Sequence, residues 1–376
     1  MKVLMVSDSG SIHTRRWASA LKEAGVDIVL YSITPESEEF YREKNIKLYI
    51  FDLFRYKKEK NLSFVSRFRA HFRAAADLKK VISAERPDIL HAHYATSYGL
   101  VAALAGFHPL IVSVWGSDIY EFPRQSVIKR LMTRYVLRKA DRVLSTSAAM
   151  ARETARYYRG QAGITPFGVD TSLFAPGTGG RPGGTVVFGT VKTLSHKYGI
   201  DLLLKAFARM REMMRRSLPD GKVPATRLEI AGKGPDTGSL KALAGELGIA
   251  SDVVFLGEIA HDDVPGFYAG TDVAVFLSRA ESFGVSAVEA MSCGVPVVAS
   301  AADGFREVLE DGGGIIVPVE DADAAAEAMM KMAMDPALRS SSGKAGREKA
   351  CRCYEWRKNV ASMTGEYEAV LASARS

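Results

Sequence analysis

The feature that most constrains the fold is an alternation of short apolar runs with helical patterns, which occurs twice along the 376 residues. The short runs are rich in Val, Ile and Leu, and the longer stretches between them have the apolar spacing of amphipathic helices. Apolar runs that do not alternate with polar residues are typical of parallel strands covered by helices on both faces. The sequence therefore predicts an α/β protein with two Rossmann-like, doubly wound domains.

The expected elements follow the chain in order. Strands are predicted in the first half at 2–6, 27–31, 46–50, 89–93, 110–114, 142–145 and 164–166, and in the second half at 185–191, 227–231, 253–256, 273–277, 295–299 and 314–317. Helices are predicted at 14–24, 63–85, 98–105, 126–139, 148–158, 199–216, 237–247, 262–268, 286–293, 305–310, 322–334 and 355–372. Ligands of such sheets bind at the carboxyl ends of the strands.

A glycine-rich stretch separates the two halves. Six glycines lie between Gly168 and Gly184, where neither strand nor helix spacing is present. Glycine clusters of this kind are typical of linkers. We therefore expect an N-terminal domain over residues 1–168, a linker over 169–184 and a C-terminal domain over 185–354. A last helical pattern, at about 355–376, follows the second domain.

The most informative motif runs from Ala280 to Pro296, where an apolar strand leads through a turn into a helix. If Glu281 lies in the turn and Glu289 in the first turns of the helix, both carboxylates can approach one ligand above the helix N-terminus. The free N–H groups there bind anions. This arrangement suits a phosphate joined to a sugar. The alternative is that two surface glutamates simply lie near a helix dipole.

Two further loops of the second half contain residues suited to a diphosphate. Lys192 and Lys197 lie five residues apart in the loop after the strand at 185–191, so both can reach one pyrophosphate and stabilise it as a leaving group. Solvated loop lysines are the alternative. Gly232 and Gly234 form a strand-to-helix turn that lacks the third glycine of a dinucleotide fingerprint, so NAD binding is not predicted.

In the first half, candidate residues follow the strand ends. Gly10 follows the first strand and would let the backbone approach a diphosphate, and Arg15 opens the next helix, where it faces an acceptor or water. His91 and His93 lie on one face of a strand, and we expect His93, nearer the end, to be the functional one; a structural histidine is the alternative. Asp118 either orients an acceptor hydroxyl or caps a turn.

These motifs resemble those of the retaining glycosyltransferases of family 4, whose E-x7-E signature matches Glu281 to Glu289. The similarity extends from residue 1 to about 370. It implies the GT-B fold, in which two Rossmann-like domains face a cleft and the last helix crosses back to the first domain. It also implies transfer of a sugar from a nucleoside diphosphate to an acceptor hydroxyl, with retained anomeric configuration and without a metal.

The resemblance assigns roles to individual residues. Glu289 would bind the donor ribose and Glu281 the donor sugar, while Lys192 stands where the family usually has Arg. Asp118 matches a family segment in which this chain has Trp115 in place of His. The implied catalytic residues are Glu281, His93, Lys197 and Lys192. The implied donor-binding residues are Gly10, Lys192, Lys197, Gly232, Gly234, Glu281, Ser282, Phe283, Gly284, Val285 and Glu289, and the acceptor side has Asp118 and Arg15.

The charge of the first half suggests an acidic partner. Residues 1–175 hold 27 Lys and Arg against 17 Asp and Glu, although the whole chain has a net charge of only +7. The stretch 53–80 combines nine basic residues with an aromatic stripe at Phe64, Phe68 and Phe72, and 126–139 has five basic residues and no acidic one. Such helices can bind an anionic membrane surface or a lipid-linked acceptor. The alternative is that the stripe packs on the sheet.

Other partners and compartments are predicted from what the motifs lack. No nucleic-acid-binding motif is present, and Asp321-Ala322-Asp323 reads as a helix cap rather than a metal site, so neither a metal nor another cofactor is expected. The three cysteines form no spaced framework, which favours a reducing compartment. We expect a cytoplasmic protein, peripheral on the inner face of the membrane.

The predicted function is therefore glycosyl transfer to a glycan or lipid-linked acceptor, in cell-surface polysaccharide, glycolipid or glycoconjugate synthesis of a bacterium or archaeon. Two alternatives stay open at this point. A GT-B sugar-nucleotide epimerase would share the donor site but need no acceptor. A non-catalytic scaffold would bind the nucleotide sugar without turning it over. The sequence does not select the nucleobase, the sugar, the linkage or the oligomeric state.

Overall fold

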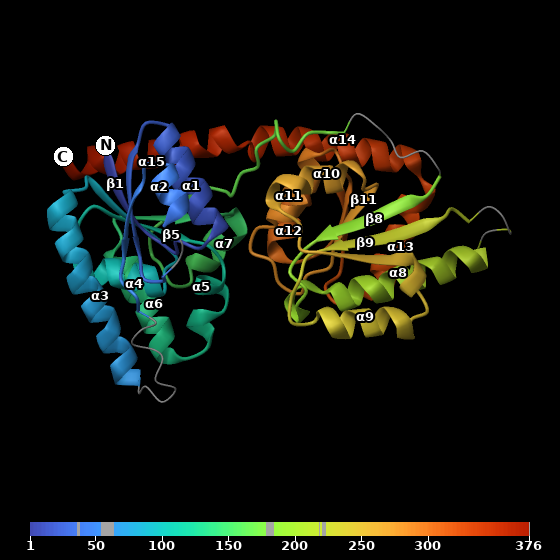
Figure 1. The fold of residues 1–376 in the computed structure, drawn as a ribbon, viewed down its shortest axis with the longest axis horizontal. Coiled ribbons are helices and arrows are strands. Elements are labelled where there is room, and N and C mark those ends of the chain that lie inside the picture. Colours follow the sequence, from blue (N-terminus) through green and yellow to red (C-terminus); the bar gives the residue numbers. More distant parts are fainter. Residues whose placement is uncertain (36–37, 54–63, 178–183, 218, 220–222, 376) are drawn as a thin grey trace. The chain divides into compact units, whose positions relative to one another are not determined.

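The computed structural model describes residues 1–35, 38–53, 64–177, 184–217, 219 and 223–375. It divides into two compact units (Figure 1). The first contains Met1–Phe167 together with Arg357–Ser376, and the second contains Gly168–Trp356. Each unit is a parallel sheet between helices, as the alternating pattern predicts.

The first unit is built on a seven-stranded parallel sheet with the order β3-β2-β1-β4-β5-β6-β7. Its strands are β1 (Lys2–Val6), β2 (Asp27–Ser32), β3 (Lys47–Ile50), β4 (Ile89–His93), β5 (Leu110–Val114), β6 (Arg142–Ser145) and β7 (Gly163–Ile164). Its helices are α1 (Ile12–Glu23), α2 (Glu39–Glu43), α3 (Phe64–Glu85), α4 (Ser97–Ala105), α5 (Ser117–Tyr120), η2 (Phe122–Arg124), α6 (Val127–Lys139), α7 (Ala148–Thr154) and α15 (Trp356–Arg375). The strand order reverses between β1 and β4. Open α/β sheets bind their ligands at the carboxyl ends of the strands beside such a switch point.

The second unit is built on a six-stranded parallel sheet with the order β10-β9-β8-β11-β12-β13. Its strands are β8 (Val186–Val191), β9 (Thr226–Ala231), β10 (Val253–Gly257), β11 (Val273–Phe276), β12 (Val297–Ser300) and β13 (Gly314–Val317). Its helices are η3 (His196–Tyr198), α8 (Ile200–Ser217), α9 (Thr237–Glu246), η4 (Ala250–Asp252), η5 (His261–Asp263), α10 (Val264–Ala269), α11 (Val285–Ser292), α12 (Asp303–Leu309), α13 (Ala322–Met334) and α14 (Pro336–Cys353). Here the order reverses between β8 and β11.

Both sheets are buried on their two faces. All four residues of the β1 run from Val3 to Val6 are 0% exposed, and every residue of β11 and β12 is buried as well. A strand with helices on both sides buries odd and even side chains alike, which is why these strands read as unbroken apolar runs. The predicted fold class is confirmed.

The last helix, α15, belongs to the first unit (red in Figure 1). Tyr367 is fully buried, and its hydroxyl lies 2.8 Å from Nδ1 of His91. Arg142 donates to both carboxylate oxygens of Glu366, at 2.7 and 2.8 Å. One buried polar contact and one bidentate ion pair therefore hold this helix on the sheet of β1 to β7.

Helix α14 is the largest element that the sequence analysis missed. Its buried side contains Gly343, Gly346 and Ala350 instead of large apolar residues. A Cβ on Gly343 would lie 2.1 Å from the carbonyl oxygen of Gly294. The helix therefore packs by close backbone approach, and such a face has no apolar periodicity to detect.

Part of the stretch expected to be a linker is packed on the second unit. Val169 forms a bridge with Glu355, and Phe174 is 1% exposed. The carbonyl of Phe174 accepts hydrogen bonds from Ser292 at 2.6 Å and from Arg347 at 2.8 Å. Residues 178–183 of the predicted linker lie outside the described residues.

One further expectation concerns a helix end. Asp321 accepts a hydrogen bond from the Ala324 N–H at 2.8 Å, so the predicted helix cap at the start of α13 is confirmed. Within the described residues, no helix is both long and apolar enough to cross a lipid bilayer.

Candidate active site

The switch point of the second sheet brings two predicted residues together. Lys192 follows β8 and Glu281 follows β11, and these two strands are neighbours. Nζ of Lys192 donates to Oε2 of Glu281 at 2.6 Å, and the two side chains are only 11% and 12% exposed. The Lys192 ammonium also lies over the Tyr198 ring, 4.8 Å from its centroid. A charged pair is thus held in place at the carboxyl ends of two strands.

Glu289 lies in the first turns of α11, as predicted, and is 5% exposed. Its Oε1 lies 3.1 Å from Nε2 of His261, which begins η5. The His261 ring lies 5.4 Å from the Phe174 ring. The sequence analysis did not name His261.

The Cys293 thiol shows how strongly this region is desolvated. Burial, with a smaller contribution from the charge of Glu289, raises the pKa of Cys293 to about 12. The thiol is therefore protonated at neutral pH and is not a nucleophile. Burial likewise raises the pKa of the Tyr268 hydroxyl, which donates to the carbonyl of Ser286 at 3.0 Å.

The loop between Glu281 and α11 requires one glycine, and the helix α12 that packs on this loop requires another. Gly284 has φ +98°, and a Cβ there would lie 2.8 Å from the Phe305 ring. Gly304 donates to the Glu281 carbonyl at 3.0 Å, and a Cβ on it would lie 2.5 Å from the backbone nitrogen of Phe283. The start of α12 therefore packs directly on this loop and holds the first N–H groups of α11 in a fixed position.

The side chains of this loop have different surroundings. Phe283 is 2% exposed and packs edge-on against Tyr354, so its side chain is part of the core. Ser282 and Val285 are half-buried. Any contact of Phe283 with the donor would therefore be made by its backbone. The predicted donor contacts of all three residues stay predictions.

Gly232 and Gly234 pack against the loop that contains Lys192. A Cβ on Gly232 would lie 1.9 Å from the Lys192 carbonyl oxygen, and one on Gly234 would lie 2.2 Å from that of Leu194. The Leu194 N–H donates to the Lys233 carbonyl at 3.1 Å. The structure thus explains both glycines by the close approach of two backbones. Their predicted contact with the nucleotide stays a prediction.

Lys197 is exposed and lies in η3, on a loop joined to the loop after β11. Its carbonyl accepts a hydrogen bond from the Arg279 N–H at 2.9 Å. The Arg279 guanidinium in turn donates to both carboxylate oxygens of Asp201, at 2.8 and 2.9 Å. Gly199 has φ +64°, and a Cβ there would lie 1.9 Å from the Leu277 carbonyl oxygen. The predicted catalytic role of Lys197 is not tested by these contacts.

In the first sheet, the switch point contains buried neutral groups. His93, at the end of β4, is 1% exposed, and its Nδ1 lies 3.2 Å from Oγ of Ser7, which follows β1. Ser7 also lies within hydrogen-bond distance of the Thr14 hydroxyl, at 2.7 Å. Burial, and secondarily the neighbouring His91, lowers the pKa of His93 well below its usual value. The His93 ring is therefore neutral. It is tilted 34° against the Trp115 ring, with the two centroids 4.5 Å apart.

His91 has partners on both ring nitrogens. Its Nδ1 lies 2.8 Å from the Tyr367 hydroxyl and its Nε2 lies 2.8 Å from Oγ of Ser113. The ring is fully buried, and burial lowers the pKa of His91 to about 3. His91 is therefore a structural contact between β4 and α15. His93, which we expected to be the functional histidine of the pair, is buried as well, and its predicted role stays a prediction.

Asp118 is 0% exposed and binds backbone groups only among its described contacts. Its carboxylate accepts from the N–H groups of Ala95 and Gly116, both at 2.8 Å, and of Trp115 at 3.2 Å. Burial raises the pKa of Asp118, while these hydrogen bonds act in the opposite direction. Asp118 thus joins the loops after β4 and β5, which supports the turn-capping alternative over contact with an acceptor.

Gly10 lies in the loop after β1, and Arg15 lies in α1, the helix that follows this loop. The Gly10 N–H donates to Oδ1 of Asp8 at 3.0 Å. Nε of Arg15 donates to the Ser9 carbonyl at 3.3 Å, and its guanidinium lies 5.5 Å from the Phe40 centroid. Their predicted contacts with diphosphate and acceptor stay predictions. Among the described residues, no three His, Cys, Asp or Glu side chains are grouped as metal ligands would be.

Two family models match this chain. Residues 2–147 match the model described as glycosyl transferase 4-like, and residues 176–349 match glycosyl transferases group 1. The chain is 30% identical over 287 residues to the GDP-mannose-dependent alpha-(1-6)-phosphatidylinositol monomannoside mannosyltransferase of Mycolicibacterium smegmatis, covering 70% of this chain and 71% of the relative. The chain belongs to the family 4 glycosyltransferases.

A second curated relative is the D-inositol 3-phosphate glycosyltransferase of Acidothermus cellulolyticus, 29% identical over 320 residues that cover 77% of this glycosyltransferase and 68% of the relative. Among solved structures, sucrose-phosphate synthase from Thermosynechococcus elongatus superposes with a TM-score of 0.81 at 21% identity, covering 99% and 100% of the two chains. Anabaena HepE in complex with UDP and glucose gives 0.78 at 18% identity, covering 98% and 100%. These similarities confirm the GT-B fold.

Proposed function

We propose that this glycosyltransferase binds a nucleoside-diphosphate sugar at the switch point of the second sheet and transfers the sugar to an acceptor hydroxyl with retention. The observation that carries the proposal is the buried Lys192–Glu281 pair, which lies at the carboxyl ends of β8 and β11. Ligands of open α/β sheets bind at this place. HepE, of the same fold, is described in complex with UDP and with UDP-glucose.

Binding of the donor would replace the contact between Lys192 and Glu281 by contacts of each residue with the donor. Its diphosphate would bind the Lys192 ammonium and the first N–H groups of α11, with Lys197 adding a second positive charge. Glu281 would then accept hydrogen bonds from the sugar hydroxyls in place of Lys192. These positive groups would stabilise the departing diphosphate without a divalent cation.

Glu289 would bind the ribose of the donor. Its carboxylate is buried in α11 beside His261, which holds one oxygen and leaves the other to accept from a hydroxyl pair. In the transfer, the bond from the anomeric carbon to the diphosphate oxygen breaks, and a bond to the acceptor oxygen forms on the same face of the sugar. The acceptor proton passes to the departing diphosphate. The transfer therefore requires no side-chain nucleophile.

The acceptor is proposed to bind to the first unit, whose basic excess suits a phosphate-bearing molecule. The names of two relatives describe transfer to a phosphatidylinositol mannoside and to inositol 3-phosphate. A phosphorylated polyol, free or linked to a lipid, is accordingly the acceptor class we propose. Synthesis of a cell-surface glycan or glycolipid on the cytoplasmic side would use such an acceptor.

A thermal-shift screen tests the donor site directly. UDP, GDP, ADP and their common sugar derivatives are added to the wild type, to Glu289→Ala and to Glu327→Ala, which removes an exposed glutamate from α13. At a hundredfold its dissociation constant, a ligand adds about 2.7 kcal/mol to the stability. We expect one nucleotide to stabilise the wild type and Glu327→Ala but not Glu289→Ala.

The same screen can contradict the proposal. If no nucleotide stabilises the folded wild type, with or without Mg²⁺, the donor site is wrongly placed. If a nucleotide sugar binds but no inositol or glycan acceptor yields a glycoside, the protein is a binding scaffold. Release of a C2 or C4 epimer without a glycoside would indicate an epimerase.

A further inference from the structure

Exposed apolar side chains are concentrated on α6. Val127 is 61% exposed, Ile128 53%, Leu131 55% and Tyr135 39%. Among the described residues, no other helix has more than one large apolar side chain this exposed. The four positions have the spacing i, i+1, i+4 and i+8, so they form one stripe along the helix. We call this stripe, with the arginines beside it, the α6 surface.

The apolar stripe is not the side of α6 that packs against the first unit. The opposite side of α6 buries Thr133, Val136 and Leu137, at 1%, 1% and 0% exposure. Ser126 caps the helix by accepting from the Lys129 N–H at 3.2 Å. The helix is therefore firmly attached to the first unit, and its apolar stripe faces outward.

Positive charges accompany the stripe without acidic partners. Arg130, Arg134, Arg138 and Lys139 are all exposed, and α6 itself contains no Asp or Glu. No ion pair joins any of these four to a carboxylate within the described part of the chain. Four uncompensated cations beside an exposed apolar stripe favour an anionic, partly apolar partner.

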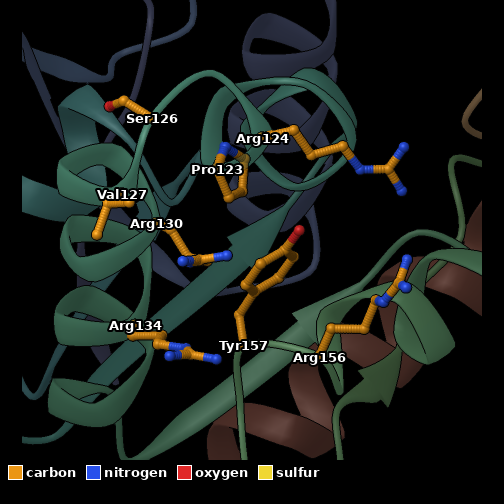
Figure 2. A pocket seen from close by; sticks show the side chains of 8 residues that line it. All are labelled: Pro123, Arg124, Ser126, Val127, Arg130, Arg134, Arg156 and Tyr157. Carbon is orange, nitrogen blue, oxygen red and sulfur yellow. The ribbon is translucent and has the colours of Figure 1, made fainter.

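A hollow beside α6 collects further arginines (Figure 2). It has a volume of about 540 Å³ and is lined by Pro123, Arg124, Ser126, Val127, Arg130, Arg134, Arg156 and Tyr157. Glu153 pairs with Arg124 at 2.8 Å and with Arg156 at 3.1 Å, so these two charges are compensated. Figure 2 shows Arg130 and Arg134 extending from α6 toward the Tyr157 ring. Their planar guanidinium groups suit bidentate binding of phosphate oxygens.

We propose that the α6 surface binds an anionic lipid bilayer, with the apolar stripe at the boundary of headgroups and acyl chains. Arg130 and Arg134 bind lipid phosphates in this arrangement. A soluble polyanion would be met by the charges alone and would leave the stripe of Ile128, Leu131 and Tyr135 in water. The bilayer interface satisfies both features. This inference goes beyond the proposed function, because it requires neither donor nor transfer.

Helix α3, the other basic helix, has a different arrangement in its described part. Its apolar residues Ala70, Ala74, Leu78 and Val81 are buried, although Phe72 is 49% exposed. Residues 54–63 and the side chains of Phe64 and Phe68 lie outside the described residues. The described part of α3 therefore packs on the sheet, and it supplies a matched control for charge removal from the same unit.

The test is cosedimentation of the purified full chain, without donor, with vesicles. Vesicles of equimolar phosphatidylglycerol and phosphatidylcholine are compared with vesicles of phosphatidylcholine alone. We expect binding to the anionic vesicles only, weakened by salt. Arg130→Gln/Arg134→Gln should lower the partition coefficient about fivefold for each charge removed. Lys79→Gln/Lys80→Gln, which removes two exposed charges from α3, should change it far less.

The apolar stripe has its own pair of variants. Leu131→Ser should lower binding to anionic vesicles, whereas Leu256→Ser, which exchanges a 45% exposed leucine of the second unit, should not. Melting temperatures and the nucleotide-induced thermal shift check that every variant is folded. If both charge pairs reduce binding equally, general charge rather than the α6 surface is responsible, and the inference fails.

Two other results would overturn the inference. The first is that the wild type does not sediment with anionic vesicles at low ionic strength. The second comes from measuring binding to a DNA duplex and to polyphosphate as well. If Arg130→Gln/Arg134→Gln abolishes binding to either polyanion but leaves vesicle binding unchanged, the site binds a soluble polyanion. Loss of vesicle binding together with an unchanged melting temperature supports the inference, whatever the outcome of the donor screen.

Discussion

The first six strands of each sheet follow the same order, but the switch points of the two sheets have opposite chemistry. In the first, the ends of β1 and β4 bury neutral groups, with His91 and His93 at 0% and 1% exposure. In the second, the loops after β8 and β11 bring Lys192 and Glu281 into an ion pair. One topology thus places a switch point in both units, while the side chains decide whether that switch point holds charge. The comparison teaches that fold locates a site and residues define it.

The largest expected effect tests the charged switch point. Lys192→Met should lower kcat about 10²–10³-fold, because it removes a group that stabilises the departing diphosphate. It should also lower the free energy of unfolding by about 3 kcal/mol, since Glu281 is left without its partner. Steady-state kinetics and urea unfolding measure the two effects.

A double variant separates the catalytic effect of Lys192 from its structural effect. In Lys192→Met/Glu281→Gln no charge is left unpaired, so most of the lost stability should return while kcat stays low. Return of activity together with stability would show that the pair is only structural, and the two switch points would then not differ in function.

The neutral switch point predicts a dependence of stability on pH. Burial lowers the pKa of His91 to about 3, while in the unfolded chain it is near its ordinary value of 6.5. The unfolded state therefore binds more protons, and stability is lost as the pH falls from 6.5 toward 3. Near the middle of this range the loss per histidine is about 1.4 kcal/mol for each pH unit.

His91→Gln should flatten this dependence, because the amide does not titrate but can still meet Tyr367 and Ser113. Urea unfolding at several pH values below 6.5 measures the slope for wild type and variant. An unchanged slope in His91→Gln would mean that the buried ring is already protonated in the folded state. The kcat of the variant, measured at pH 7.5, should remain close to that of the wild type.

Asp118 provides a smaller test of the first unit. Asp118→Ala leaves three backbone N–H groups without their acceptor and should cost about 2 kcal/mol or more of unfolding free energy. Asp118→Asn keeps an acceptor oxygen and should cost less. A large fall of kcat in Asp118→Asn with unchanged stability would instead assign Asp118 to the acceptor, as the resemblance implies.

The smallest expected effect concerns Gly232. Gly232→Ala places a Cβ against the Lys192 carbonyl and should cost about 1–3 kcal/mol, with weaker nucleotide binding because the Lys192 loop must move. Gly238→Ala, six residues further along, meets no atom within 4 Å and serves as the control. Calorimetric titration that finds equal nucleotide affinity for both variants would separate the glycine turn from the donor site.

Much of the fold was predictable, because parallel strands buried on both faces leave unbroken apolar runs. Strands such as β1, β4, β5 and β13 have the predicted bounds. Helix α14 was not predictable in this way, since its buried residues are two glycines, an alanine and a lysine rather than large apolar residues. Short helices such as α2 and α5 lack the length over which a period can be read.

The sequence named the residues of the candidate site but not the contacts between them. The spacing of Glu281 and Glu289 indicated a turn and a helix start, and the structure places them so. The pairing of Lys192 with Glu281, 89 positions apart, depends on which strands are neighbours. His261 and the backbone contacts of Gly232 depend on the same tertiary arrangement, which no local pattern records.

The measurement that tests the central claim most directly is calorimetric titration of UDP and of GDP into wild type, Lys192→Met and His91→Gln. If the second switch point binds the diphosphate, Lys192→Met should raise the dissociation constant of the nucleotide about tenfold or more, because one charge-assisted hydrogen bond is lost. His91→Gln should bind the nucleotide like the wild type. Equal affinity in Lys192→Met, or an equal loss in His91→Gln, would contradict the account.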